Sequence, residues 1–249
     1  MSDFNRGYPR TAPVGAADMA VDAGLRAFML GVYNKMALGL LLSAALAYVT
    51  SQVAPVRDLL FRVTPDGTLV GITLLGMIIA FSPIVVLLVG QFAVRQTPKS
   101  SGIVYWLVVA LFGASLGDIA LIYRLGSIFS TFLITATAFG GLSLFGYTTK
   151  KDLTGFGSFL IMGLIGLVVA SVVNMFLHSG ALAFAVSVIG VLIFAGLTAY
   201  DTQRLKMTYY RLGGDQAALG VATNYGALSL YLDFLNIFLF LLRIFGGRR

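Results

Sequence analysis

Long runs of apolar residues, separated by short polar stretches, dominate this 249-residue chain. Seven of these runs reach the roughly 20 residues that a helix needs to cross the hydrocarbon core of a bilayer. We therefore predict an all-α polytopic membrane protein with seven transmembrane helices. The spans are expected at about residues 30–50, 69–93, 103–123, 127–147, 156–177, 182–202 and 224–245.

The last span carries a polar stripe along one face. Its four members follow at steps of four, four and three residues, which keeps them on the same side of a helix: Tyr225, Ser229, Asp233 and Asn236. An ionisable residue near the middle of a span costs roughly 2.5–3.5 kcal/mol on insertion scales, so it normally faces a bundle interior or a wet cavity. The pattern predicts that this helix lies inside the bundle, with its stripe turned away from lipid.

Composition agrees with a membrane protein and sets the domain boundary. The chain is 58% hydrophobic and 11% charged, with a mean hydropathy of +0.92, whereas soluble domains carry about 25% charged residues. The first 29 residues contain Pro, Gly and charges but no apolar core, which argues against a cleaved signal peptide. We expect residues 1–29 to form a flexible cytoplasmic tail and residues 30–249 to form the membrane domain.

Basic residues indicate the orientation of the spans. With the N-terminus inside and seven full spans, eleven of the 17 basic residues fall on the inner side, which the positive-inside rule favours. A re-entrant last segment would move three more to that side, so this alternative stays open. The net charge of +7 is explained by loops that face anionic headgroups, and nucleic-acid binding is not expected.

Enzymatic chemistry is not expected. The chain has no Cys, which removes thiolate metal sites and Cys nucleophiles, and no phosphate-binding or hydrolase motif is present. The single histidine, His178, lies in a short turn and is expected to be solvated. Intramembrane aspartyl proteolysis is disfavoured because Tyr200-Asp201 matches only half of the required motifs and no Gly-x-Gly-Asp precedes Asp233. No cofactor is implied.

Two acids are expected to meet in the inner half of the membrane. Asp201 ends the sixth span and Asp233 lies in the seventh, which rises from the same face. Two carboxylates in one low-dielectric site titrate as a coupled unit, which makes a proton switch, or a cation site when both are ionised. The alternatives are a solvated Asp201 paired with Arg204, and an Asp233 that is a structural hub with Asn236 and Ser229.

Other features of the spans carry weaker predictions. Asp118, near the outer end of the third span, is either an interfacial acid beside Arg124 or a cation ligand in an outer vestibule. Pro83 predicts a kink and a freed carbonyl in the second span. Gly113 and Gly117 have close-packing spacing, and Lys35 is able to snorkel outward.

Three segments resemble the Bax inhibitor-1 family, also called the transmembrane Bax inhibitor motif proteins, in its bacterial branch. They are TAYDTQRLK, ALSLYLDFLNIFLFLLRIFG and KKDLTGFGSFL. The similarity in hydropathy extends from about residue 26 to residue 247. The resemblance implies seven helices, with six surrounding the last one, and an integral protein of the bacterial inner membrane.

The resemblance also implies a pH-sensitive calcium leak channel controlled by two aspartates, which match Asp201 and Asp233 here. A basic residue that latches one aspartate corresponds to Arg95, so Asp201 and Arg95 are expected to form the inner gate. Ca²⁺, as the transported ion bound transiently by Asp201 and Asp233, protons and the lipid bilayer are the expected partners. The alternative is a membrane regulator that binds a membrane-anchored quality-control protease, and a third class is a proton-coupled transporter.

Overall fold

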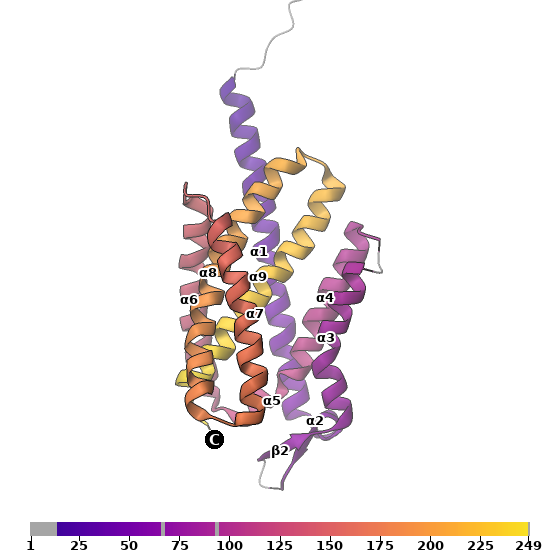
Figure 1. Ribbon diagram of the computed structural model, residues 1–249. Coiled ribbons are helices and arrows are strands. Elements are labelled where there is room, and N and C mark those ends of the chain that lie inside the picture. The colour runs from indigo at the N-terminus through magenta and orange to yellow at the C-terminus, as the bar shows by residue number, and fades with distance from the viewer. Residues whose placement is uncertain (1–13, 66–67, 93–94, 249) are drawn as a thin grey trace, which may run out of the picture.

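The computed structural model describes residues 14–65, 68–92 and 95–248 (Figure 1). Within them lie seven helices long and apolar enough to span a membrane, which confirms the predicted all-α polytopic fold. These helices are α1 (Val14–Gln52), α3 (Leu74–Phe92), α4 (Pro98–Ser115) continued by α5 (Gly117–Ile122), α6 (Leu125–Thr148), α7 (Thr154–Leu177), α8 (Gly180–Leu212) and α9 (Gln216–Phe245).

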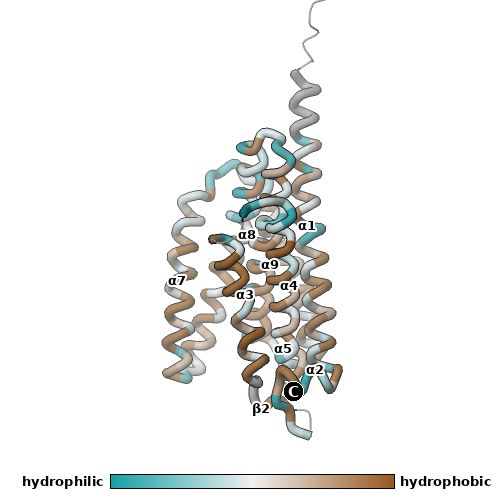
Figure 2. The backbone as a smooth tube through the Cα atoms, turned by 90° about the vertical axis from the view of Figure 1, so that its right-hand side faces the viewer, coloured by the Kyte–Doolittle hydropathy of each residue, from teal (hydrophilic) through white to brown (hydrophobic). Residues whose placement is uncertain are grey.

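The last helix is the central one, as its polar stripe predicted. Helices α1, α4, α6 and α8 all pack directly against α9, while α3 packs mainly on α4 and α7 on α8. Of the apolar segment of α9, 61% is buried, compared with 11% for α7, which lies at the edge of the bundle in Figure 2. Four helices therefore form the immediate wall around α9, and two others widen the bundle.

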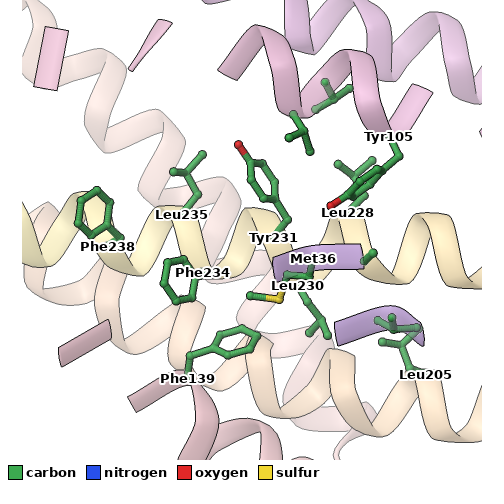
Figure 3. Packing of buried hydrophobic residues seen from close by; sticks show 14 of the residues in the cluster. Met36, Tyr105, Phe139, Leu205, Leu228, Leu230, Tyr231, Phe234, Leu235 and Phe238 are labelled. Atoms are coloured by element: carbon green, nitrogen blue, oxygen red, sulfur yellow. The ribbon is translucent and has the colours of Figure 1, made fainter. Parts of the chain in front are cut away.

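Large side chains of α9 build the main core (Figure 3). Tyr231 and Leu230 are fully buried, and Phe234 stacks edge-on against Phe139 of α6 with ring centroids 5.6 Å apart. The hydroxyl of Tyr231 hydrogen-bonds that of Ser43 on α1 at 2.8 Å, so the polar end of this aromatic residue is satisfied inside the core. This packing fixes α9 against its neighbours and holds its polar residues at defined places.

Several helices are longer than predicted. Helix α1 begins at Val14, so the boundary expected at residue 29 falls inside a continuous helix, and residues 1–13 of the predicted tail lie outside the described residues. The polar connection expected between the last two spans is largely helical, because α8 continues to Leu212 and α9 starts at Gln216. Gly213 and Gly214, with φ of 56° and 90°, make the turn, and Asp215 caps α9 by accepting two backbone N–H groups.

The start predicted for the second span was wrong. Leu69–Ile72 forms strand β2, which pairs antiparallel with β1 (Phe61–Val63) after the short helix α2 (Ala54–Leu60). The membrane helix α3 begins only at Leu74, where the hydroxyl of Thr73 donates to the carbonyl of Leu59 at 2.6 Å. The sequence also carries a turn signal, Pro65-Asp66-Gly67, between the first two spans, and its last two residues lie outside the described part of the chain.

Pro83 frees a backbone carbonyl and two glycines allow close packing, as their positions predicted, whereas the kink expected at Pro83 stays a prediction. Pro83 lies within α3, and the carbonyl of Ile79 that loses its helical partner accepts the hydroxyl of Ser82 at 2.7 Å. A Cβ on Gly113 would lie 2.5 Å from the Cα of Ser43, so α4 and α1 approach closely at this point. Gly117 likewise leaves room for Phe61.

Helix α9 runs the length of the bundle and does not turn back. Its 30 residues correspond to about 45 Å of helix. It starts at the end of the bundle from which the N-terminal part of α1 leaves and finishes at the opposite end (Figure 1). There the backbone N–H of Arg124 donates to the carbonyl of Gly247 at 3.1 Å. The re-entrant alternative is therefore wrong for this fold.

Candidate functional site

The two acids singled out in the sequence lie on the most extensively packed pair of helices, α8 and α9. Asp201 is 6% exposed and Asp233 is 5% exposed. The guanidinium of Arg204 contacts both Asp201 and Ser229, and Ser229 lies one helical turn before Asp233 on α9. The structure thus brings the two carboxylates into one buried site. Asp201 lies 11 residues before the end of α8, deeper in the helix than its place at the end of the predicted span suggested.

An ion pair on α8 holds Asp201. Its Oδ1 lies 3.2 Å from Nη2 of Arg204, one turn further along the helix. The same guanidinium nitrogen donates to the hydroxyl of Ser229 on α9 at 3.2 Å. Because the Arg204 side chain is 47% exposed while that of Asp201 is 9% exposed, this guanidinium links the buried acid to the helix surface. Asp201 is thus paired locally, as one alternative predicted, but it is not solvated.

Asp233 lacks such a partner. Within the described part of the chain, its Oδ2 is the one buried side-chain oxygen or nitrogen that makes no hydrogen bond. Leaving a buried polar atom unpaired costs about 1–3 kcal/mol, and more for an ionised group. Buried polar atoms in folded proteins are nearly always hydrogen-bonded, so this carboxylate requires an explanation. A proton or a cation on the carboxylate would remove or offset its charge.

The predicted polar stripe divides between different partners. Ser229 faces the Asp201–Arg204 pair. The hydroxyl of Tyr225 lies 3.5 Å from the carbonyl of Gly90 at the end of α3. Asn236 donates to the carbonyl of Leu232 in its own helix at 2.8 Å. The hub proposed between Asp233, Asn236 and Ser229 is not among the hydrogen bonds of the described residues, so Asp233 is not explained as a structural network.

Arg95 does not contact the site in this structure. It is exposed in the connection between α3 and α4. The ion pairs found in the described ranges join Asp201 to Arg204 and Arg57 to Asp58. In this conformation Arg204 therefore occupies the position at Asp201 that the resemblance gave to Arg95. A latch made by Arg95 stays a prediction about another conformation.

Asp118 lies at the other end of the bundle. It opens the short helix α5 and lines a cavity of about 180 Å³ together with Tyr123 and Arg243. The arginine whose charge acts on Asp118 is Arg243 of α9, not Arg124 as its position in the chain suggested. Asp118 is partly exposed in this cavity, at the opposite end of the bundle from the start of α9, and its role as an interfacial acid or a vestibule ligand stays a prediction.

A second polar cluster on α9 was missed. Asn224 is buried, and its Nδ2 donates to the carbonyl of Pro98 at 2.9 Å and to the hydroxyl of Ser101 at 2.8 Å. Its Oδ1 accepts from Nζ of Lys35. The Lys35 ammonium lies 5.3 Å from the ring of Tyr105, so Lys35 points into the bundle and does not snorkel. The signal available in the sequence was a lysine inside an apolar run, which needs a partner.

The acid pair offers carboxylate oxygens, which suit a proton or a hard cation, but it lacks a full set of protein ligands for a metal ion. The described residues hold no group of three or more His, Cys, Asp or Glu side chains that could bind a metal ion. Ca²⁺ takes six to eight oxygen ligands. Two carboxylates and the hydroxyl of Ser229 would supply part of that set and leave several positions to water. Such a site suits an ion in transit better than a resident one.

Comparison with known proteins places these features in one family. Residues 25–249 match the family described as inhibitor of apoptosis-promoting Bax1. A protein of Caulobacter vibrioides is 64% identical over the full length of both chains. The inner membrane protein YbhL of Escherichia coli is 46% identical over 91% of this chain and 94% of its own. A Rickettsia prowazekii protein is 43% identical over 97% of this chain and 98% of its own.

Proposed function

The chain belongs to the Bax1 inhibitor family of membrane proteins, and on that premise we propose that it is a pH-sensitive calcium leak channel gated by Asp201 and Asp233. One observation carries the proposal: Asp233 is buried at the centre of the bundle, beside a second acid, with a carboxylate oxygen that has no hydrogen-bond partner in the described part of the chain. A membrane protein retains such a costly group where an ion or a proton binds.

The charges of the site explain how protons would act. When both acids are ionised, the two carboxylates and Arg204 carry a net charge of −1, which attracts a cation. One proton makes the cluster neutral, and because protons and Ca²⁺ bind the same oxygens they compete for the site. Protonation would therefore change both cation occupancy and the Asp201–Arg204 ion pair. A change of one pKa unit between two conformations corresponds to about 1.4 kcal/mol, or tenfold in their ratio.

The two arginines have different parts in this proposal. Arg204 holds Asp201 in the conformation described here, where the two side chains are 3.2 Å apart and only the arginine is half-exposed. Arg95, exposed in the connection between α3 and α4, would be the basic residue that pairs with Asp201 in a second conformation of the inner gate. Because Arg204 and Asp201 lie on the same helix, the exchange would need the Arg204 side chain to turn away from Asp201 and the connection between α3 and α4, which carries Arg95, to approach α8.

At the other end of the bundle, Asp118 would attract cations into the outer cavity. We place the N-terminus in the cytoplasm and the protein in the inner membrane. The excess of basic residues on the side of the N-terminus supports the orientation, and the similarity to the inner membrane protein YbhL of Escherichia coli supports the inner membrane.

The test is Ca²⁺ flux from sealed proteoliposomes between pH 5 and 8. We expect pH-dependent flux from the wild type, and a flattened dependence in Asp201→Asn and Asp233→Asn that the double variant does not deepen, because the acids form one coupled unit. Asp58→Asn is the matched control, since this acid is exposed and lies outside the site. The same preparations are checked for folding by thermal unfolding in detergent.

Two results would count against the channel. If folded wild-type protein leaks no more Ca²⁺ than empty vesicles, the leak is excluded, and the alternative of a regulator that binds a membrane-anchored protease becomes the hypothesis to pursue. If the two acid substitutions act additively, the acids are independent and the coupled sensor is wrong.

A further inference from the structure

A groove lies between α1 and α6, away from the acid pair. Both helices pack on α9, and the space between them forms a hollow of about 490 Å³. Met29 and Tyr33 of α1 line one side, and Phe139 and Ser143 of α6 line the other. Leu30 and Leu144, which are 50% and 63% exposed, also line it. The groove thus opens toward the acyl chains of the bilayer.

One end of the groove is positively charged. Arg26 lines this end and is exposed, and no ion pair or hydrogen bond of its guanidinium is found among the described residues. Asp22 lies one turn away but does not pair with it in that set. Lys206 of α8 lies nearby, since its Nζ donates to the carbonyl of the groove residue Tyr147 at 3.1 Å. Two cations therefore border an otherwise apolar groove.

We propose that this groove binds one phospholipid with an anionic headgroup. Its phosphate would lie between Arg26 and Lys206, and an acyl chain would lie along Met29, Tyr33 and Phe139. Charge complementarity favours this occupant: the guanidinium binds phosphate oxygens, and basic pockets between membrane helices on one side of the bilayer bind acidic headgroups. The apolar lining matches the chain of the same molecule.

The groove is joined by hydrogen bonds to the helix that carries Asp201. The hydroxyl of Tyr33 bonds Ser143 in the groove wall. Ser143 in turn hydrogen-bonds the hydroxyl of Thr202 at 3.0 Å, and Thr202 follows Asp201 on α8. A lipid in the groove would contact Tyr33 and Ser143, which are hydrogen-bonded to this turn of α8. Lipid binding would in this way act on the turn that carries Asp201.

Two adjacent glycines provide matched variants. A Cβ at Gly140 or Gly141 would meet no atom within 4 Å, so both positions tolerate a larger side chain. Gly140 lines the groove, whereas Gly141 is not among its lining residues. Gly140→Leu should fill the groove, and Gly141→Leu should leave it open. Arg26→Gln removes the free cation, with Arg62→Gln as the control at an exposed arginine near the hairpin.

The experiment is native mass spectrometry of the full chain in detergent with added phosphatidylglycerol or phosphatidylcholine. We expect one bound lipid, with phosphatidylglycerol preferred. Arg26→Gln should weaken phosphatidylglycerol binding about fivefold, which is the effect of about one basic residue near a membrane surface, and Gly140→Leu should remove the bound lipid. Both controls should bind as the wild type does.

Three results would overturn the proposal: equal binding of the two lipids, the same binding by Gly140→Leu and Gly141→Leu, or a dimer that only Gly140→Leu dissociates. The last would identify a second copy of the chain as the occupant. The measurement does not depend on Ca²⁺ flux, so its failure leaves the proposed function untouched.

Discussion

Two polar clusters lie along α9, and they differ in how completely hydrogen bonds satisfy them. At Asn224, near the start of the helix, both polar atoms of the amide have partners, which come from α1 and α4. At Asp233, nine residues further along, one carboxylate oxygen is buried with no hydrogen-bond partner in the described chain. The same helix therefore carries one satisfied cluster and one unsatisfied site.

The charges differ as well. The Lys35 ammonium lies near the faces of Tyr105 and Trp106 and donates to an amide, which are favourable surroundings for a cation. The carboxylate of Asp233 has a like charge, Asp201, as its neighbour, offset in part by Arg204. A fully satisfied network makes a core rigid and specific, whereas a partly satisfied one lowers stability. We infer that the Asn224 cluster holds three helices together and that the Asp233 site is retained for function.

The largest effect should come from breaking the satisfied cluster. Asn224→Leu removes three hydrogen bonds, one of them to an ammonium group, and should lower the free energy of unfolding by about 3 kcal/mol. Unfolding in detergent, followed by thermal or denaturant melting, measures the change. Asn34→Leu is the control, since Asn34 is exposed on α1. If both variants unfold alike, the Asn224 cluster does not hold the helices together.

A smaller effect should follow from removing the cation beside Asp201. Arg204→Gln leaves a buried acid without its ion pair, but the half-exposed guanidinium is screened by solvent, so we expect a loss of about 2 kcal/mol. Arg95→Gln should change stability by less than about 0.5 kcal/mol, as surface substitutions do. The comparison decides which arginine stabilises this conformation, and a larger loss for Arg95→Gln would reverse our assignment.

At the unsatisfied site, Asp233, a substitution should raise the stability of the fold, whereas the two substitutions above lower it. Asp233→Asn keeps the shape of the side chain and removes a charge that has no hydrogen-bond partner for one of its oxygens, so we expect the protein to be more stable by about 1 kcal/mol. The melting temperature in detergent measures this gain, with Asp58→Asn as the exposed control. A loss of stability comparable to that of Asn224→Leu would make Asp233 a structural residue and remove the distinction between the two clusters.

The sequence predicted more about the spans and the acid pair than about their partners. Apolar runs marked the seven membrane helices, and the spacing of Ser229 and Asp233 placed α9 inside the bundle, because helical periodicity is a local property. The meeting of Asp201 and Asp233 followed from the order of two neighbouring spans. The end of α8 and the start of α9 were missed because the polar residues between 206 and 222 resemble a loop, although all but the turn at residues 213–215 continue the two helices beyond their apolar segments.

Long-range contacts lay beyond sequence reasoning. Lys35 and Asn224 are 189 positions apart, and no spacing rule joins them. Asp118 and Arg243 line the same cavity because α5 and α9 come together there, although 125 positions separate the two residues. Which arginine pairs with Asp201 depends on the conformation. Arg204 lies one turn from Asp201 on the same helix, whereas Arg95 lies in the connection between α3 and α4. Such contacts depend on the packing angle of helices, which a single sequence does not state.

Asp152 is an exposed acid whose carboxylate is hydrogen-bonded, which makes it a contrast to the buried Asp233. Its substitution should have the smallest effect on stability. Oδ1 of Asp152 accepts the backbone N–H of Thr154 at 2.9 Å at the start of α7. Hydrogen bonds from the hydroxyl and the N–H of Thr154 hold the pKa of Asp152 below its usual range. A lowered pKa means that the carboxylate stabilises the folded protein above the ordinary value of about 3.9 and that this contribution is lost as the pH falls through the folded-state pKa.

Asp152→Ala should therefore speed hydrogen exchange in the first turn of α7 between pH 6 and 8, and the difference from the wild type should disappear as the pH falls below the folded-state pKa, where the carboxyl group is protonated in both states. Asp152→Asn, which keeps an oxygen acceptor, should lie between the two. The neighbouring residue Leu153 donates its N–H to Gln203 on α8 at 2.8 Å, so this loop stays attached in all three proteins. If global stability fell as far as in Asn224→Leu, an exposed and satisfied acid would matter as much as a buried network, and hydrogen-bond satisfaction would not separate structural from functional groups in this bundle.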